Sequence, residues 1–314
     1  MLTIQHTKNF RIEKPCIATI GTFDGVHLGH QKILQHLNTL KKKLNLQTAL
    51  LTFDPHPRKV LFPEQRDLKL LTLADEKLHL LKEQGIDVTV VYPFDKEFAN
   101  IEAEKYIAQI LIKQLNVKHL IIGYDHKFGK NREGDFQLLK NYSPKYDFTV
   151  EEISAKDIDN IAISSSKIRK YLEDGNVELA EKFLGHAYFI KAVVVKGKQL
   201  GKTIGFPTAN LKVMSPDKLI PKIGVYFVSI EIETKVYFGM MNIGHNPTVD
   251  NTQQIKQEVN IFDFLGDLYS KTIRINFLKR LRDEKKFENL AQLVKQLELD
   301  KEQCSNLIQT RKSS

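Results

Sequence analysis

Gly21-Thr-Phe-Asp-Gly-Val-His-Leu-Gly-His30 is the stretch that decides the fold of the first half of the chain. A short apolar run at 16–20 precedes it, and apolar residues recur at helical spacing from Ile33 to Leu44 after it. A strand, a glycine-rich turn and a helix N-terminus in this order form an anion site, because free N–H groups and the positive end of the helix dipole face one point. We therefore expect a phosphate-bearing ligand at this turn.

Two histidines, His27 and His30, lie three residues apart in the turn. A His-x-x-His pair alone is weak evidence, but a strand, Gly-x-Phe-Asp-Gly and a helix around it form the context of a functional motif. We expect the imidazoles to bind a polyphosphate whose charge shifts during a reaction. The neighbouring residues that we expect to bind the nucleotide are Gly21, Phe23, Asp24 and Gly29.

Residues 1–183 alternate short apolar runs with helical patterns. Strands are expected at 16–20, 49–53, 88–92, 119–122 and 148–150. Helices are expected at 30–45, 74–84, 101–115 and 165–174. This alternation predicts an α/β domain with a doubly wound parallel sheet, in which ligands bind at the carboxyl ends of the strands.

Residues 184–314 follow a different pattern, because closely spaced strands have no helices between them. Strands are expected at 188–195, 225–232, 236–240, 258–262 and 272–277. They predict an all-β second domain, an antiparallel barrel or sandwich. A helix should end the domain, with one apolar face made of Phe287, Leu290, Leu293, Val294 and Leu297.

Three further polar clusters belong to the first half. The loop 52–57 presents His56 between two prolines, although a surface histidine at a rigid turn is the simpler reading. The loop 123–129 presents Asp125, with Arg132 and Asp135 just beyond it. The segment 163–169 begins a helix and combines hydroxyls with cations: Ser164, Ser165, Ser166, Lys167 and Arg169. Serines there could simply cap the helix, but two cations in the same turn favour a phosphate site.

These residues offer no evident nucleophile or general base. A substrate phosphate that attacks the α-phosphate of ATP is already anionic, so the site need only align the reactants and neutralise the charge on pyrophosphate. His27, His30 and Arg169 suit that role, with Ser164 and Ser165 as ATP-binding hydroxyls. Asp24 or Asp125 could hold a ribose or the substrate. The first half is therefore consistent with adenylyl transfer.

A second phosphate motif opens the barrel at 200–210. Gly201, Lys202 and Gly205 make a loop that suits phosphates but lacks the spacing of a Walker A motif. Thr208 and Asn210 would project from one face of a strand, and their neutral oxygens suit Mg²⁺. A Thr-x-Asn pair that only makes hydrogen bonds at a strand edge is the competing interpretation.

A carboxylate is needed if an alcohol attacks the γ-phosphate of ATP, because the alcohol must lose a proton. Glu258 and Asp263 are the candidates on the strand near 258–262. We favour Glu258, which we expect at the start of the strand and so nearer a barrel rim. By itself, Glu258 could also be an ordinary surface glutamate.

Composition limits the class of protein. The net charge of +9 comes from 47 basic and 38 acidic side chains and suits phosphate ligands, but few aromatics interleave with the basic runs, so nucleic acid is not expected. The chain has no apolar run long enough to span a membrane and its N-terminus lacks a signal peptide. Two cysteines exclude a disulfide framework, and we expect a cytoplasmic protein.

Together these motifs resemble the prokaryotic bifunctional riboflavin kinase/FAD synthetase family over nearly the whole chain. The motifs at 21–30, 52–57, 123–129 and 163–169 are similar to its nucleotidyltransferase (Rossmann-like) half. Those at 201–210, 242–248 and 258–264 are similar to its kinase half. The resemblance implies that ATP phosphorylates riboflavin to FMN in the barrel and adenylylates FMN to FAD, releasing pyrophosphate, in the first domain. It also implies that Thr208 and Asn210 bind Mg²⁺ and that Glu258 is the base.

Two residues depart from the family pattern. Asn260 stands where the family usually has His, and Ser270 where it usually has Gly. Two other functions stay open. The first half could be an adenylyltransferase whose barrel only binds RNA or another ligand, or the kinase half could be inactive and serve flavin storage or regulation.

Overall fold

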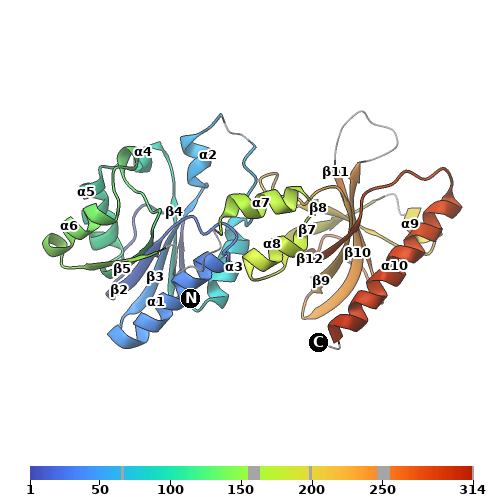
Figure 1. Cartoon of the computed structure of the whole chain (residues 1–314), viewed down its shortest axis with the longest axis horizontal. Helices are drawn as coiled ribbons and strands as arrows, with labels where there is room; N and C mark the ends of the chain where they lie inside the picture. The colour runs from blue at the N-terminus through green and yellow to red at the C-terminus, as the bar shows by residue number, and fades with distance from the viewer. Residues whose placement is uncertain (65–66, 155–162, 198–199, 246–254, 313–314) are drawn as a thin grey trace. The chain divides into compact units, whose positions relative to one another are not determined.

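The computed structural model describes residues 1–64, 67–154, 163–197, 200–245 and 255–312. The chain divides into two compact units, Met1–Ser165 and Ser166–Ser314 (Figure 1). Helices α7 (Ser165–Glu173) and α8 (Val177–Leu184) connect the first sheet to the barrel in sequence, and α8 packs against two barrel strands. Our functional boundary between residues 183 and 184 stays a prediction.

The first unit contains a six-stranded sheet in which every neighbouring pair is parallel, as predicted. Its spatial order is β1-β4-β3-β2-β5-β6. The strands are β1 (Leu2–Gln5), β2 (Cys16–Ile20), β3 (Gln47–Asp54), β4 (Val88–Pro93), β5 (Val117–Gly123) and β6 (Thr149–Ile153). Strand β2 is central and all of its residues are buried, because helices cover both faces of a parallel sheet. Sequence analysis missed β1, a short and partly exposed edge strand.

The strand order reverses beside β2. The chain places β3 and then β4 on one side of β2, and it returns to place β5 on the other side (Figure 1). In a doubly wound sheet, the crevice outside the carboxyl ends of strands at such a reversal is the usual ligand site. The turn at residues 21–27 follows β2 directly, so the fold puts the His-x-x-His motif at this crevice.

Several helices of the first unit match the prediction, but two segments differ. The segment predicted as one helix at 101–115 divides into α5 (Ala103–Tyr106) and the π-helical η1 (Ile107–Gln114). Helix α6 (Phe136–Tyr146) was missed because it contains Pro144, which reads as a helix breaker. The other helices are α1 (Leu28–Leu44), α2 (Pro57–Leu61), α3 (Ala74–Glu83), α4 (Lys96–Ala99) and η2 (Lys130–Arg132).

The second unit is a closed six-stranded barrel whose paired strands are all antiparallel, which confirms the barrel reading. Around the barrel the order is β10-β11-β8-β7-β12-β9. The strands are β7 (Tyr188–Val195), β8 (Ala209–Val213), β9 (Gly224–Ile232), β10 (Lys235–His245), β11 (Ile255–Ile261) and β12 (Thr272–Arg282). Ile230, Ile275 and Phe277 are completely buried in its core. A short helix, α9 (Leu200–Thr203), precedes β8.

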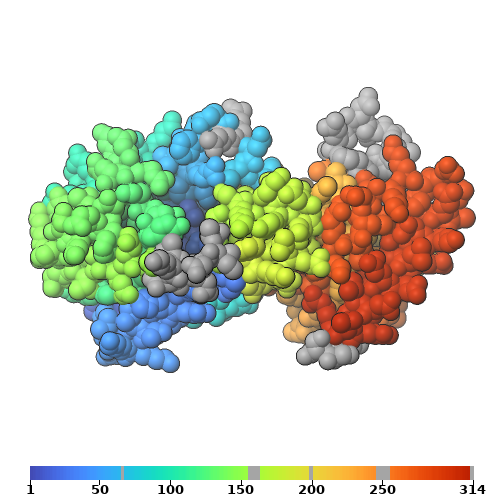
Figure 2. All heavy atoms as spheres, viewed as in Figure 1, coloured from blue at the N-terminus to red at the C-terminus, as the bar shows by residue number. Residues whose placement is uncertain are grey.

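The final helix, α10 (Leu290–Lys312), packs on the barrel, and in the space-filling view its red atoms adjoin the orange-red atoms of the barrel (Figure 2). Val294, Leu297 and Cys304 lie in this contact. Part of the predicted apolar face is wrong, because Phe287 precedes the helix and Leu290 is 60% exposed. None of the helices in the described ranges is both long and apolar enough to cross a membrane.

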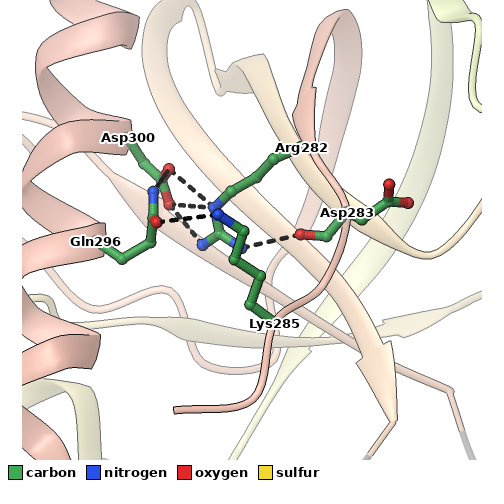
Figure 3. Close-up of polar contacts among 5 residues, drawn as sticks. All are labelled: Arg282, Asp283, Lys285, Gln296 and Asp300. Atoms are coloured by element: carbon green, nitrogen blue, oxygen red, sulfur yellow. Dashed lines mark hydrogen bonds and ion pairs between the residues drawn. The ribbon is translucent and has the colours of Figure 1, made fainter.

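One ion pair fastens α10 to β12 (Figure 3). The Arg282 guanidinium donates from Nε to both Asp300 oxygens at 2.9 and 3.0 Å and from Nη2 to Oδ2 at 2.6 Å. Gln296 Nε2 donates to Asp300 Oδ1 at 2.9 Å. Asp300 is only 2% exposed, and each of its two carboxylate oxygens accepts two hydrogen bonds. A buried bidentate pair of this kind specifies where the helix docks.

Candidate active sites

The first candidate site is built on the start of α1. His27 is the N-cap, and its Nδ1 accepts a hydrogen bond from the backbone N–H of His30 at 3.4 Å. The two imidazole rings stack with centroids 3.6 Å apart, and the Phe23 ring lies 4.6 Å from that of His30. A side chain at Gly21 would come within 3.1 Å of the Phe23 ring, so glycine leaves room for this stack. The structure therefore brings the two predicted histidines together.

His30 is uncharged at neutral pH in this arrangement. Burial, the neighbouring His27 and the Lys77 ammonium hold the pKa of His30 well below its usual value. Its buried Nδ1 has no hydrogen-bond partner among the residues that the structure describes. An anionic ligand would supply the missing counter-charge and raise this pKa, because a nearby opposite charge favours the protonated imidazole. The pair is thus suited to gain positive charge as a phosphate arrives.

Asp24 is held inside the protein. Its carboxylate accepts hydrogen bonds from the backbone N–H groups of Leu71 at 3.2 Å and Thr72 at 2.9 Å, and it is only 3% exposed. The Thr72 hydroxyl donates to the same carboxylate at 3.2 Å. These contacts support a role in shaping the turn, so a direct contact with a ribose stays a prediction. Ser165 joins the same turn, since its hydroxyl donates to the Asp24 carbonyl at 3.0 Å.

A small cavity of about 20 Å³ lies beside this turn. Asp24, Asp54, His56 and Lys77 contribute to its wall. His56 also caps α2, where its Nδ1 accepts from the Arg58 N–H at 3.1 Å, so the turn geometry of the simpler reading is present. Sequence analysis missed Lys77, because a lysine on an amphipathic helix reads as a solvated residue.

The other clusters of the first half are distributed as follows. Asp125 is exposed in the loop after β5, beside the crevice, whereas Asp135 caps α6 by accepting from the Leu138 N–H at 2.9 Å. Ser164 directly precedes α7. Arg169 lies on the buried face of α7 within the second compact unit, and Lys167 Nζ lies 4.9 Å from the Phe183 ring centroid. The phosphate roles of Arg169 and Ser164 stay predictions.

The second candidate site is a row of side chains across three barrel strands. Glu258 on β11 pairs with Asn210 on β8 and with Asn242 on β10. Directly opposite residues in antiparallel strands place their side chains on the same face, with Cβ atoms about 4.5–5.5 Å apart. The barrel therefore sets the predicted base beside a predicted metal ligand, and it adds Asn242, whose role we did not identify from the sequence.

The predicted positions of Glu258 and Thr208 on their strands are wrong. Strand β11 begins at Ile255, so Glu258 lies at its centre rather than its start, because the strand extends further than its apolar pattern. Thr208 precedes β8, which begins at Ala209, so only Asn210 of the pair lies on the strand. The rest of the 242–248 motif, 246–248, lies outside the described residues.

Glycines give the site its close contacts. A Cβ at Gly197 would lie 1.9 Å from Asn210 Nδ2, and one at Gly201 would lie 2.2 Å from the Phe206 carbonyl and 3.5 Å from Thr208 Oγ1. Gly205 has a φ of +81°, a conformation that favours glycine. The loop can therefore lie close against Thr208 and Asn210, and its role in binding phosphate stays a prediction.

A cavity adjoins the row formed by Glu258, Asn210 and Asn242. Its volume of about 360 Å³ lies within the size range of small-molecule sites. Lys202, Thr208 and Asn210 form polar parts of its wall. The apolar part comes from β7, β11 and the following loop: Val194, Val259, Ile261, Phe264, Leu268 and Tyr269. The cavity can hold an apolar, planar group next to polar oxygen atoms.

Asn260 and Ser270, the two residues that depart from the family pattern, both have local structural explanations. Asn260 Nδ2 donates to the Pro207 carbonyl at 2.6 Å, so it fixes the residue before Thr208 against β11. Ser270 has a φ of +62° in a turn closed by the Lys271 N–H on the Leu268 carbonyl. The third residue of such a turn favours glycine, because glycine alone adopts positive φ without steric cost.

Ser270→Gly should stabilise the second unit. Left-handed backbone costs a non-glycine residue about 1–2 kcal/mol, and the entropy of glycine in the unfolded chain offsets roughly 0.5–1 kcal/mol of the gain. We expect the free energy of unfolding to rise by about 0.5–1 kcal/mol, measured by urea denaturation. Ser270→Ala is the control, since alanine keeps the strain; equal stability of the two variants would contradict the explanation.

Comparison with known proteins matches each half of the chain to a family model. A family model for FAD synthetase matches residues 9–167, and one for riboflavin kinase matches residues 184–308. Bifunctional riboflavin kinase/FMN adenylyltransferases from Haemophilus influenzae and Bacillus subtilis are each 38% identical, the first over 95% of both chains and the second over 92% of this chain and 91% of its own. The Escherichia coli (strain K12) protein is 39% identical, over 92% of this chain and 91% of its own.

A solved structure with the same fold is described as a macrolide-efflux protein from Streptococcus pneumoniae. It is 33% identical, has a TM-score of 0.89, and the match covers 98% of this chain and 99% of that one. Both halves of the present chain thus match in sequence, and the whole chain matches in structure. The chain belongs to the family of bifunctional riboflavin kinase/FMN adenylyltransferases.

Proposed function

We propose that this chain makes FAD from riboflavin in two ATP-dependent steps. Its barrel phosphorylates riboflavin to FMN, and its N-terminal unit adenylylates FMN to FAD and releases pyrophosphate. The observation that carries the proposal is the pairing of Glu258 with Asn210 beside a cavity with polar and apolar walls. The mixed wall suits a ring with a polar tail better than RNA. A reducing cytoplasm suits its two buried free cysteines.

In the kinase step, the ribityl hydroxyl attacks the γ-phosphate of ATP and loses a proton. We assign this proton to Glu258, because Glu258 pairs with Asn210, and Asn210 forms part of the cavity wall. Asn210 and Thr208 would hold Mg²⁺ through neutral oxygens, a donor set that fits this cation. When bound, Mg²⁺ neutralises charge on the phosphates of ATP. Gly201, Lys202 and Gly205 enclose the phosphates.

In the adenylyl step, the FMN phosphate attacks the α-phosphate of ATP, and pyrophosphate leaves. No side chain needs to remove a proton, since the attacking oxygen is already anionic. His27, His30 and the free N–H groups at the start of α1 bind the phosphates, and the imidazoles take up charge as pyrophosphate forms. The sequence motif at 163–169 predicts Ser164, Ser165 and Arg169 as further phosphate-binding residues.

Two incubations, one with riboflavin and one with added FMN, test the two steps. The chain is mixed with riboflavin and Mg-ATP, and the flavins are separated by chromatography at successive times. We expect FMN first and then FAD. FAD from added FMN but no FMN from riboflavin would identify an inactive or purely ligand-binding barrel. Absence of FAD from added FMN would refute the adenylyl step.

Asn210→Ala should raise the Mg²⁺ concentration needed for FMN formation, because one oxygen that holds the cation is lost. Even the loss of a group that only supports a metal ligand usually weakens metal affinity about 10–100-fold, so we expect the titration midpoint to shift by at least this much. FAD formation from added FMN should keep its Mg²⁺ dependence. An unchanged titration for FMN formation would make Thr-x-Asn an ordinary hydrogen-bonding pair.

A further inference from the structure

Lys77 is a buried cation that the mechanism above does not use. It lies on α3 and is 6% exposed. Its ammonium donates to the Thr22 carbonyl at 3.1 Å, the Thr52 hydroxyl at 2.9 Å and the Phe53 carbonyl at 3.2 Å. All three of its protons are therefore used. Thr22 follows β2 and Phe53 lies near the end of β3, so one ammonium joins the two segments that carry the histidine turn and His56.

The charge of Lys77 is costly for folding. Burial lowers the pKa of Lys77 from 10.5 to about 8, even though Asp24 and Asp54 oppose the shift. Between these two pH values the unfolded chain binds more protons than the folded one, so stability rises with pH there and burial of the ammonium weakens the fold at pH 7. An apolar side chain would often pack such a position at no loss of stability. Lys77 lies beside the ligand crevice although its burial lowers stability, and this combination indicates a function.

We infer that Lys77 is a positioning residue for adenylyl transfer: its ammonium holds the turn after β2 and the end of β3 in one arrangement and places fixed positive charge behind the anion site. This inference rests on the proposed adenylyl step. Lys77 acts through other groups, since its protons contact protein oxygens. Its charge also adds to burial and to the neighbouring His27, which both lower the pKa of His30 more strongly.

The inference predicts an alkaline limit to adenylylation. The charged or titratable groups around Lys77 are Asp24 after β2, Asp54 at the end of β3, His56 at α2, His30 on α1 and Glu76 on its own helix. When pH rises through about 8, the ammonium becomes an amine and loses one donor and its charge. Adenylylation should then fall, whereas the barrel, which does not contain Lys77, should show no decline from this cause.

Lys77→Met and Lys77→Arg in the full chain test this. FAD formation from FMN and FMN formation from riboflavin are measured between pH 6.5 and 9.5, with Lys82→Met, an exposed lysine on the same helix, as the matched control. We expect Lys77→Met to lower kcat for FAD formation about 10²-fold, the usual effect of a reacting group misplaced by about 1 Å. The alkaline limb should vanish in Lys77→Met and move beyond the measured range in Lys77→Arg, which also restores part of the rate.

Three outcomes decide the matter. A Lys77→Met variant that keeps the wild-type rate and alkaline limb overturns the inference, while wild-type chain that makes no FAD from FMN overturns the proposed function instead. If Lys77→Met does not fold, Thr52→Val replaces it, because it removes one acceptor of the ammonium and keeps the shape. The limb should then move to lower pH; an unmoved limb in Thr52→Val also overturns the inference.

Discussion

Glu258→Gln lowers the turnover of riboflavin phosphorylation about 10²- to 10⁴-fold, the usual effect of losing a positioned general base. Glutamine keeps the size and the hydrogen-bonding ability of the side chain but cannot accept the ribityl proton. Riboflavin binding should change little, because the cavity wall does not include Glu258. Steady-state kinetics with separated flavins measure the first effect, and equilibrium titration of riboflavin measures the second.

Two comparisons make this result specific. FAD formation from added FMN should be intact in Glu258→Gln, since that step asks no side chain for a proton. Asp263→Asn is the matched control, because Asp263 is exposed in the turn after β11. If Glu258→Gln phosphorylates riboflavin at a near wild-type rate while Asp263→Asn does not, the base is Asp263.

His30→Ala should lower FMN adenylylation about 10²- to 10³-fold, because the loss of one group that stabilises transition-state charge costs about 2.7–4 kcal/mol. The reason is the position of His30, stacked on His27 in the first turn of α1. FAD formation from added FMN measures the effect, and riboflavin phosphorylation by the same sample should be nearly unchanged.

His36→Ala is the control for the loss of an imidazole from α1. His36 Nε2 lies 2.8 Å from Glu151 Oε1 on β6, a contact with no part in the proposed site. We expect His36→Ala to keep both activities. Equal loss of both activities in folded His30→Ala would show that the two reactions share one site, contrary to the two separate sites proposed.

The fold could be predicted because its periodicities are strong. Buried parallel strands such as β2 are continuous apolar runs, and the barrel strands follow one another without helices. The errors arose where a local signal opposed the tertiary structure. Pro144 lies within α6, and β11 continues past its apolar part, so neither is visible in a sequence window.

The site residues, too, could be predicted where the signal is local and could not where it depends on the tertiary structure. Motifs with local spacing, such as His27 and His30, are visible in the sequence because one turn of one helix brings them together. The row that includes Glu258 and Asn210 depends on strand register, which spacing alone does not specify. Asp24 looked like a ligand-binding carboxylate, yet its partners Leu71 and Thr72 lie 47 and 48 positions further along the chain.

The order of the strands along the chain also decides which of the two units can fold first during synthesis. Every strand of the first sheet lies before Ser154, so this unit has all its pairing partners while the barrel is still being translated. The barrel cannot close until β12 emerges, because β12 lies between β7 and β9, and its helix then docks through Arg282 and Asp300. Domains generally fold as units from the N-terminus. The half that consumes FMN is therefore complete before the half that makes it.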